Sequence, residues 1–241
     1  MLTVSAPMKA RSGKRLTPKR LLLGMSIIEL LIGIAIGLII LAGASTMFVG
    51  NVTSSRLLLL EARINQDLRT TMDLITRDLR RGAYWGNSLS GTVAAGSTST
   101  TQANPYSAVT VTGSPIQIDY AYTRDATENN VLNAATEQFG FKLNTTTHAI
   151  QMYIGEAWQT LTNTDILVIP DNGFLITPTE TAIDIRNACA KTCAGASCPQ
   201  IRVRTYNIVL TGISKTDSAV SRTLRSQVRV RNDAISGSCP A

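Results

Sequence analysis

An apolar stretch, residues 30–55, contains no charged side chain and limits how this chain can fold more than any other feature. About 20 helical residues, at roughly 1.5 Å each, cross the hydrocarbon core of a bilayer, which is about 30 Å thick, so the stretch is long enough for a membrane helix. One acid, Glu29, stands directly before it. A carboxylate inside a membrane costs about 2.5–3.5 kcal/mol on insertion scales, so Glu29 needs either a partner or a position near the headgroups.

The positive charge of the chain is concentrated ahead of this stretch. The formal net charge is +7, and six of the 23 Lys and Arg residues precede Gly24, where there is no acid. The remaining 17 stand against 16 acids, so the rest of the chain is nearly neutral. Because basic flanks stay in the cytoplasm, we expect the rest of the chain to be exported. The six residues are Lys9, Arg11, Lys14, Arg15, Lys19 and Arg20.

Three interpretations of this N-terminal region remain open. An uncleaved signal anchor explains the basic flank and the apolar run, but it gives Glu29 no role. A secretory signal would be cut at a small-residue pattern such as residues 42–44, although the helical pattern continues past it. The third interpretation places the cut between Gly24 and Met25, where it creates an α-amine that can partner Glu29.

The residues around that bond resemble a known family. The segment "GMSIIELLIGIAIGL" is similar to the class III leader of type IV prepilins and type II secretion pseudopilins, in which a membrane aspartic peptidase cuts after a glycine. The resemblance implies prepilin peptidase as a partner, cleavage after Gly24 and N-methylation of Met25, where the usual first residue is Phe. It also implies that Glu29, the fifth mature residue, meets the amine of a neighbouring subunit during assembly.

Gly33 and Gly37 form a G-x-x-x-G spacing in the same apolar stretch. Such a spacing lets another backbone approach a helix closely. Because glycine is common in membrane helices, a packing role and the absence of a specific contact both remain open.

The pattern after Gly50 predicts that the helix continues as an amphipathic helix to about Arg81. Apolar residues recur at steps of four and three, and charged residues occupy the other faces. Gly82 favours a stop there. We expect the second half of the helix to pack on a soluble domain, with the Arg and Asp residues of 77–81 on a solvated face. The apolar positions are Leu60, Ile64, Leu68, Met72, Ile75 and Leu79.

The end of this helix carries a second resemblance, to a more specific group of pilins. The segment "RDLRRGAYWGN", residues 77–87, is similar to the helix terminus of PilW-type minor pilins, except that the order of Gly82-Ala83 is reversed. The chain also lacks the proline that many pilins carry in the membrane half of the helix. We expect Tyr84-Trp85 to pack where the helix joins the domain.

Residues 88–107 are rich in Ser, Thr, Gly and Ala and predict a surface loop. Beyond them the hydrophobic period changes to two, which is typical of strands. An antiparallel sheet packed on the helix would bury both the apolar stripe of the helix and the apolar face of the sheet. The predicted strands are residues 108–112, 116–122, 139–143, 149–154, 165–169, 201–210 and 222–230. The prediction is an α+β, type IV pilin-like fold with a leader (1–24), a membrane or filament-core helix (25–55), an amphipathic helix (56–81), a loop (82–107) and a periplasmic β-rich domain (108–241).

The four cysteines lie in the last quarter of the chain, after the segment that would export them. An even number in an oxidising compartment favours two disulfides, and three pairings are possible. Zinc is the alternative, but the spacing lacks paired C-x-x-C motifs and the only histidine, His148, is remote. We expect residues 182–200 to form an irregular, disulfide-stapled excursion. The candidates are Cys189, Cys193, Cys198 and Cys239.

The sequence carries no phosphate loop, nucleophile elbow or convincing acid pair. We therefore expect that the protein is not an enzyme and that it binds no cofactor, no metal and no small-molecule substrate. Arginines that alternate on the late strands could contact DNA or an acidic partner, but the nearly neutral mature chain favours a solvated sheet face. They are Arg202, Arg204, Arg222, Arg225, Arg229 and Arg231.

The resemblance implies a minor pilin that waits in the inner membrane with a periplasmic domain. It would then help to initiate a type IV pilus with other minor pilins and the major pilin, near the tip, and support adhesion, twitching motility or DNA uptake. One alternative is a pseudopilin of type II secretion. Another is a membrane-tethered or secreted binding protein that never polymerises.

Overall fold

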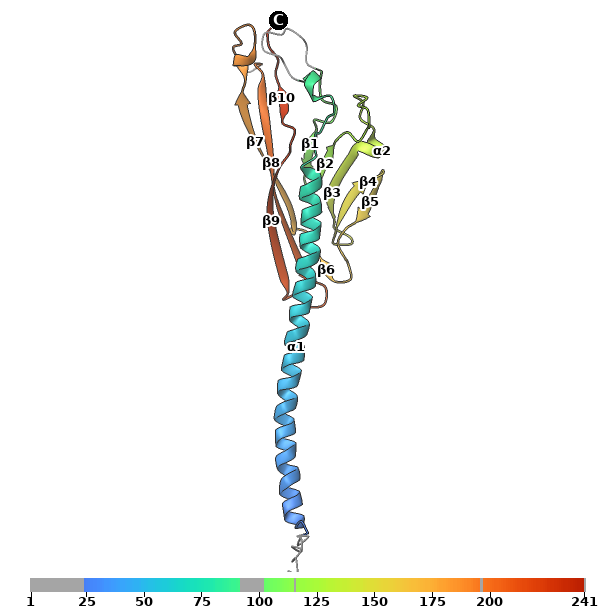
Figure 1. Cartoon of the computed structure of the whole chain (residues 1–241), viewed down its shortest axis with the longest axis vertical. Coiled ribbons are helices and arrows are strands. Elements are labelled where there is room, and N and C mark those ends of the chain that lie inside the picture. The colour runs from blue at the N-terminus through green and yellow to red at the C-terminus, as the bar shows by residue number, and fades with distance from the viewer. Residues whose placement is uncertain (1–23, 92–101, 115, 196, 241) are drawn as a thin grey trace, which may run out of the picture. The chain divides into compact units, whose positions relative to one another are not determined.

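The computed structural model describes residues 24–91, 102–114, 116–195 and 197–240. The chain divides into two compact units, Met1–Thr53 and Ser54–Ala241, and helix α1, Ile27–Leu79, contributes to both (Figure 1). The predicted leader up to residue 23 and residues 92–101 of the predicted loop lie outside the described residues.

The described part of the first unit is the N-terminal part of α1. Its apolar residues are interrupted by hydroxyl side chains that bond back to the helix: Ser45 donates to the carbonyl of Leu41 at 2.8 Å, and Thr53 donates to that of Val49 at 2.9 Å. These local bonds satisfy the hydroxyls within the helix itself. The segment therefore carries few polar groups that require water or a partner.

The second unit contains two antiparallel sheets, where the sequence predicted one. The first sheet runs in chain order, and its strands are joined by short turns except for residues 122–137, which connect the second strand to the third. Residues 145–148 form the turn of a hairpin between the third and fourth strands. The next turn, Gly155-Glu156, has positive φ at both residues, as a two-residue hairpin of type I′ requires. The strands are β1 (Val109–Thr112), β2 (Gln117–Ala121), β3 (Gln138–Asn144), β4 (Ala149–Ile154) and β5 (Ala157–Thr160), with the short helix α2 (Ala134–Glu137) before β3.

The second sheet is built around its longest strand, β8 (Gln200–Ser214), with which every other strand of that sheet pairs. The other strands are β6 (Leu167–Val168), β7 (Phe174–Asp184), β9 (Ser221–Arg229) and β10 (Ala234–Ser236). Two short 3₁₀ helices, η1 (Ser88–Gly91) and η2 (Arg186–Ala188), lie in the connections.

Strand β7 was missed by the sequence analysis, and residues 182–184 belong to it rather than to an irregular excursion. From Thr177 onward all of its residues are exposed, so neither face carries the apolar alternation by which a strand is recognised. Its register comes instead from pairing with β8 over its whole length, from Phe174 opposite Leu210 to Asp184 opposite Gln200.

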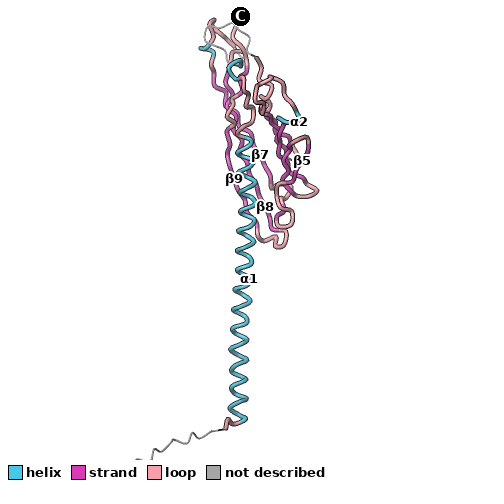
Figure 2. The backbone as a smooth tube through the Cα atoms, turned by 45° about the vertical axis from the view of Figure 1, so that its right-hand side comes forward, coloured by secondary structure: helices cyan, strands magenta, loops and turns pink. Residues whose placement is uncertain are grey.

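The core of the second unit forms where the C-terminal part of α1 meets both sheets (Figure 2). The predicted helix stripe is confirmed: five of its six residues are buried, and Leu60 packs at the edge. Gly212 on β8 allows the close approach, because a Cβ there would press on Leu167 and lie 3.0 Å from Leu68 Cδ2. The buried stripe is Ile64, Leu68, Met72, Ile75 and Leu79.

Candidate functional site

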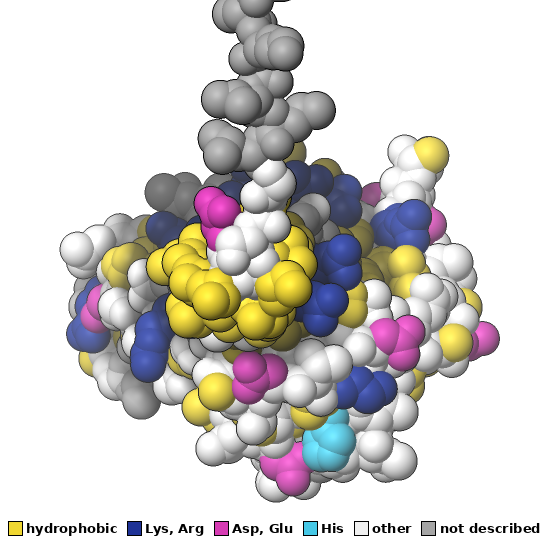
Figure 3. Space-filling model, turned by 90° about the horizontal axis from the view of Figure 1, so that it is seen from below, with side chains coloured by type: hydrophobic (Ala, Val, Ile, Leu, Met, Phe, Trp, Pro, Cys, Tyr) yellow, Lys and Arg dark blue, Asp and Glu magenta, His cyan; other side chains and the backbone are white. Residues whose placement is uncertain are grey.

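The first candidate site is the apolar part of α1. Throughout residues 27–53 no side chain is buried, and Val52 alone is half-buried. Figure 3 shows the hydrophobic side chains gathered around this end of the helix. Within the described part of the chain, α1 is the one helix long and apolar enough to cross a membrane. Its length and composition are sufficient for a membrane anchor.

The predicted cleavage site lies just ahead of this helix. Gly24 and Met25 are exposed and precede the first helical residue, Ile27, so the bond between them lies in accessible, non-helical backbone. Glu29 is exposed in the first turn, where the unpaired N–H groups of a helix favour a negative charge.

Gly33 and Gly37 lie four residues apart and therefore on one face of the helix. A Cβ added to either would meet no atom within 4 Å. The two glycines form an open notch that another backbone can approach.

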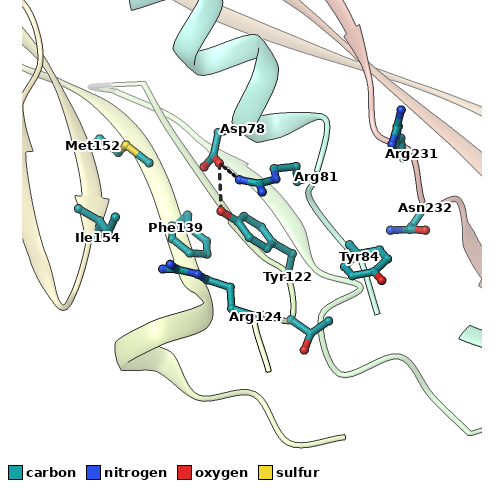
Figure 4. A pocket seen from close by; sticks show the side chains of 11 residues that line it. Asp78, Arg81, Tyr84, Tyr122, Arg124, Phe139, Met152, Ile154, Arg231 and Asn232 are labelled. Atoms are coloured by element: carbon teal, nitrogen blue, oxygen red, sulfur yellow. Dashed lines mark hydrogen bonds and ion pairs between the residues drawn. The ribbon is translucent and has the colours of Figure 1, made fainter. Parts of the chain in front are cut away.

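The second candidate site is the joint between the end of α1 and the first sheet (Figure 4). Asp78 is 6% exposed, and it accepts hydrogen bonds from the hydroxyls of Tyr120 and Tyr122, the latter at 3.0 Å. Arg81 approaches the same carboxylate at 3.6 Å and lies over the ring of Tyr122, 5.3 Å from its centroid. The expectation that the acids of 77–81 are solvated is therefore wrong for Asp78, because two buried hydroxyls need its oxygens.

The pKa of Tyr122 is raised to about 12, mainly because the side chain is buried and secondly because of the negative charge of Asp78. The same two causes raise the pKa of Tyr120 well above its usual value. Both hydroxyls thus stay protonated at neutral pH and act as donors to the carboxylate. The joint binds the last turn of the helix to β2 through charge-assisted hydrogen bonds.

The segment that follows the helix is held by a polar cluster that the sequence did not indicate. Trp85 is 2% exposed, as expected, and its indole N–H donates to Asn130 at 2.9 Å, whereas its neighbour Tyr84 is 51% exposed, against expectation. Tyr106 is fully buried within the predicted surface loop, and its hydroxyl lies within hydrogen-bond distance of the carboxylates of Glu128, at 3.2 Å, and Glu137, at 3.3 Å.

The titration of this cluster follows from its burial. Burial raises the pKa of Tyr106 to about 12, and the charges of Glu137 and Glu128 add to the rise. Burial alone would also raise the pKa of Glu128, but hydrogen bonds from the backbone N–H groups of Asn130 and Gly86 hold it below its usual value.

The disulfide pairing that the sequence left open is Cys189 with Cys239 and Cys193 with Cys198. The first bridge ties the end of the chain to the connection between β7 and β8, across 50 residues of sequence. The second closes a short loop within that connection. Across the described residues, no three side chains of the metal-ligating types come together.

One of the late-strand arginines departs from the expected solvated face. Arg204 is 8% exposed and donates to the backbone carbonyls of Ser107 and Asn232, the latter at 3.1 Å. It therefore links the start of the first sheet to the segment after β9 and is not available to an external partner.

A helix with an exposed apolar half and an amphipathic half, packed on antiparallel sheets with two disulfides, defines an α+β fold of the type IV pilin kind. The model of the family "Prepilin peptidase-dependent protein B" matches residues 57–230, more than half of the 241 residues. The chain therefore belongs to this family, whose name states its dependence on prepilin peptidase. No curated protein and no solved structure matches the chain.

Proposed function

We propose that this protein is a minor pilin that is cut after Gly24, remains anchored in the inner membrane by α1, and is then incorporated into a type IV pilus whose assembly it helps to initiate. Its role is structural rather than catalytic. The partners are prepilin peptidase, the major pilin and other minor pilins. The similarity of residues 77–87 to PilW-type proteins supports the choice of a minor pilin.

The observation that carries the proposal is the combination of two independent features. The family match begins at residue 57, so it owes nothing to the leader-like segment that starts at Gly24. That segment presents an accessible Gly24–Met25 bond ahead of an exposed apolar helix. One chain thus combines membership of a peptidase-dependent family with a candidate cleavage site for that peptidase.

The physical role of Glu29 follows from its position. In a membrane its charge costs about 2.5–3.5 kcal/mol on insertion scales, and such groups are retained where a partner exists. Cleavage creates an α-amine at Met25, and in a bundle of such helices the amine of one subunit can pair with Glu29 of the next. The pairing sets the axial register of the subunits, while the Gly33 and Gly37 notch allows close packing.

The test replaces Glu29 by Ala, Gln and Asp in cells that assemble the fibre. We expect mass spectrometry to show that all three variants begin at Met25, because the peptide bond that is cut is unchanged. We expect the Ala and Gln variants to be absent from sheared fibres and the Asp variant to be partly retained, since it keeps the carboxylate.

Normal amounts of Glu29→Ala in sheared fibres would refute the role of the carboxylate. A mature N-terminus other than Met25 would refute the proposed class. Gly24→Ala serves as the processing control, because a side chain before the cut is expected to leave the precursor uncleaved and the protein at its larger size. A secretion defect with intact pili on deletion would assign the protein to a pseudopilus instead.

A further inference from the structure

A cavity of about 580 Å³ opens beside the joint at the end of α1. It is formed by the helix end, by the residues that follow β2, by β3 and β4, and by the segment after β9. Its volume falls in the range of about 300–1,000 Å³ that is usual for ligand sites. Its mouth is open to solvent, since the Arg81 side chain is 63% exposed and Tyr84 is 51% exposed.

The charge around this cavity is positive. Arg81, Arg124 and Arg231 line it together with a single acid, Asp78. The carboxylate of Asp78 is already occupied by two tyrosine hydroxyls and by Arg81. Among the described residues, Arg124 and Arg231 are exposed and form no ion pair with an acid. Two guanidinium groups are thus available to an external anion.

The wall of the cavity is apolar and positions one of these groups. Phe139 is 1% exposed, and Met152 and Ile154 lie beside it on β4 (Figure 4). The guanidinium carbon of Arg124 lies over the ring of Phe139, 5.9 Å from its centroid. Contact with a fixed aromatic ring orders an arginine before a ligand arrives, which lowers the entropy lost on binding.

Guanidinium groups match carboxylates because their N–H donors form two parallel hydrogen bonds with the two oxygens. The apolar wall requires a second feature, namely a hydrophobic side chain next to that carboxylate. We propose that this cavity binds a peptide segment of another protein that carries a carboxylate beside an apolar side chain. The carboxylate pairs with the guanidinium group of Arg124, and the apolar side chain rests on Met152 and Ile154, which are half-buried and line the cavity. The proposal stands on the cavity alone and holds whether or not the chain enters a pilus.

The test uses the full chain in non-ionic detergent, labelled with ¹³C at the methionine methyl groups. The probe is the peptide acetyl-Gly-Leu-Phe with a free carboxylate, and its C-terminal amide is the matched control. Met152 lines the cavity and reports binding, whereas Met72 is buried in the core and serves as the reference. We expect the acid to shift the Met152 signal in a saturable way and the amide to bind about tenfold more weakly, as expected for the loss of a charge-assisted pair.

The variants separate the cavity from general attraction by positive charge. We expect Arg124→Gln to weaken binding of the acid by about tenfold. Arg231 lies on the other side of the cavity (Figure 4), and we expect Arg231→Gln to weaken binding less. Arg225→Gln removes the same charge from an exposed position on β9 outside the cavity, and we expect it to leave binding unchanged. A wild-type tryptophan emission spectrum for each variant shows that the fold is retained.

Three results would overturn the proposal. Equal binding of acid and amide would show that the carboxylate is not recognised. An equal effect of Arg225→Gln and Arg124→Gln would show that only net charge matters. Binding of N-acetyl-phenylalanine as tight as that of the peptide would assign the cavity to a free small acid instead of a protein segment. Failure of Glu29→Ala to block assembly would leave this site unaffected, so the two proposals fail separately.

Discussion

Asp78 is the residue at which a single substitution should most clearly reveal how the helix is held to the sheet. Its carboxylate accepts hydrogen bonds from the hydroxyls of Tyr120 and Tyr122, and these tyrosines are only 2% and 6% exposed. In Asp78→Ala both hydroxyls lose their charged acceptor. Each buried hydrogen bond to a charged group is worth about 1.5–3 kcal/mol, so we expect the free energy of unfolding to fall by about 3–5 kcal/mol.

The measurement is urea unfolding of the full chain in detergent micelles, followed by tryptophan fluorescence. Trp85 follows the joint directly and is 2% exposed, so its emission should report loss of the joint. With an m value of about 2 kcal/mol per molar urea, the expected loss lowers the midpoint by about 1.5–2.5 M. Asp73→Ala is the control, because this acid is exposed on the same helix and its loss should change stability by less than about 0.5 kcal/mol.

A double-mutant cycle with Tyr120→Phe tests the mechanism itself. Because the tyrosine hydroxyl and the carboxylate form one interaction, the two substitutions should be non-additive by about 1–3 kcal/mol. A loss below about 1 kcal/mol for Asp78→Ala, or strict additivity in the cycle, would refute the view that this carboxylate holds the helix to the sheet.

Two further predictions concern pH and the disulfides. The pKa of Tyr122 is raised from 10.0 to about 12 in the folded state, so its contribution to stability should be complete below about pH 10 and be lost as the pH rises to about 12; unfolding curves that stay unchanged over this range would contradict it. Replacing Cys189 and Cys239 by Ala should cost about 4 kcal/mol, against about 2 kcal/mol for Cys193 and Cys198, because the first bridge closes a loop with a separation of 50 residues and the second one of 5. Equal midpoints for the two double variants in urea would contradict the loop-length argument.

The elements that the sequence predicted well are those whose own pattern requires a partner. The helix stripe from Ile64 to Leu79 has an apolar period of three and four, and burial of that stripe follows wherever a sheet is available. Strands β1 to β4 of the first sheet were predicted for the same reason, whereas the short edge strand β5 was missed. Strand β7 has no such pattern beyond Ile176, so only its hydrogen bonds to β8 define it.

The two candidate sites differ in how far the sequence could predict them. Gly24, Met25 and Glu29 are neighbours in sequence, so a linear motif contains the whole of the predicted cleavage and assembly site. The cavity at the helix end is lined by Arg81, Arg124 and other residues from segments far apart in the chain. Its positive charge therefore cannot be predicted from the sequence pattern of any one segment.

The sequence by itself determined the apolar helix, its amphipathic continuation and the presence of a strand-rich domain that carries the cysteines, because each depends on residues close together in the chain. Tertiary structure alone decided the disulfide pairing, the burial of Asp78 and the gathering of arginines around the cavity. The physical reason is that hydrophobic periodicity and charge flanks act locally. The burial of a polar group, by contrast, depends on which distant side chains offer it hydrogen bonds.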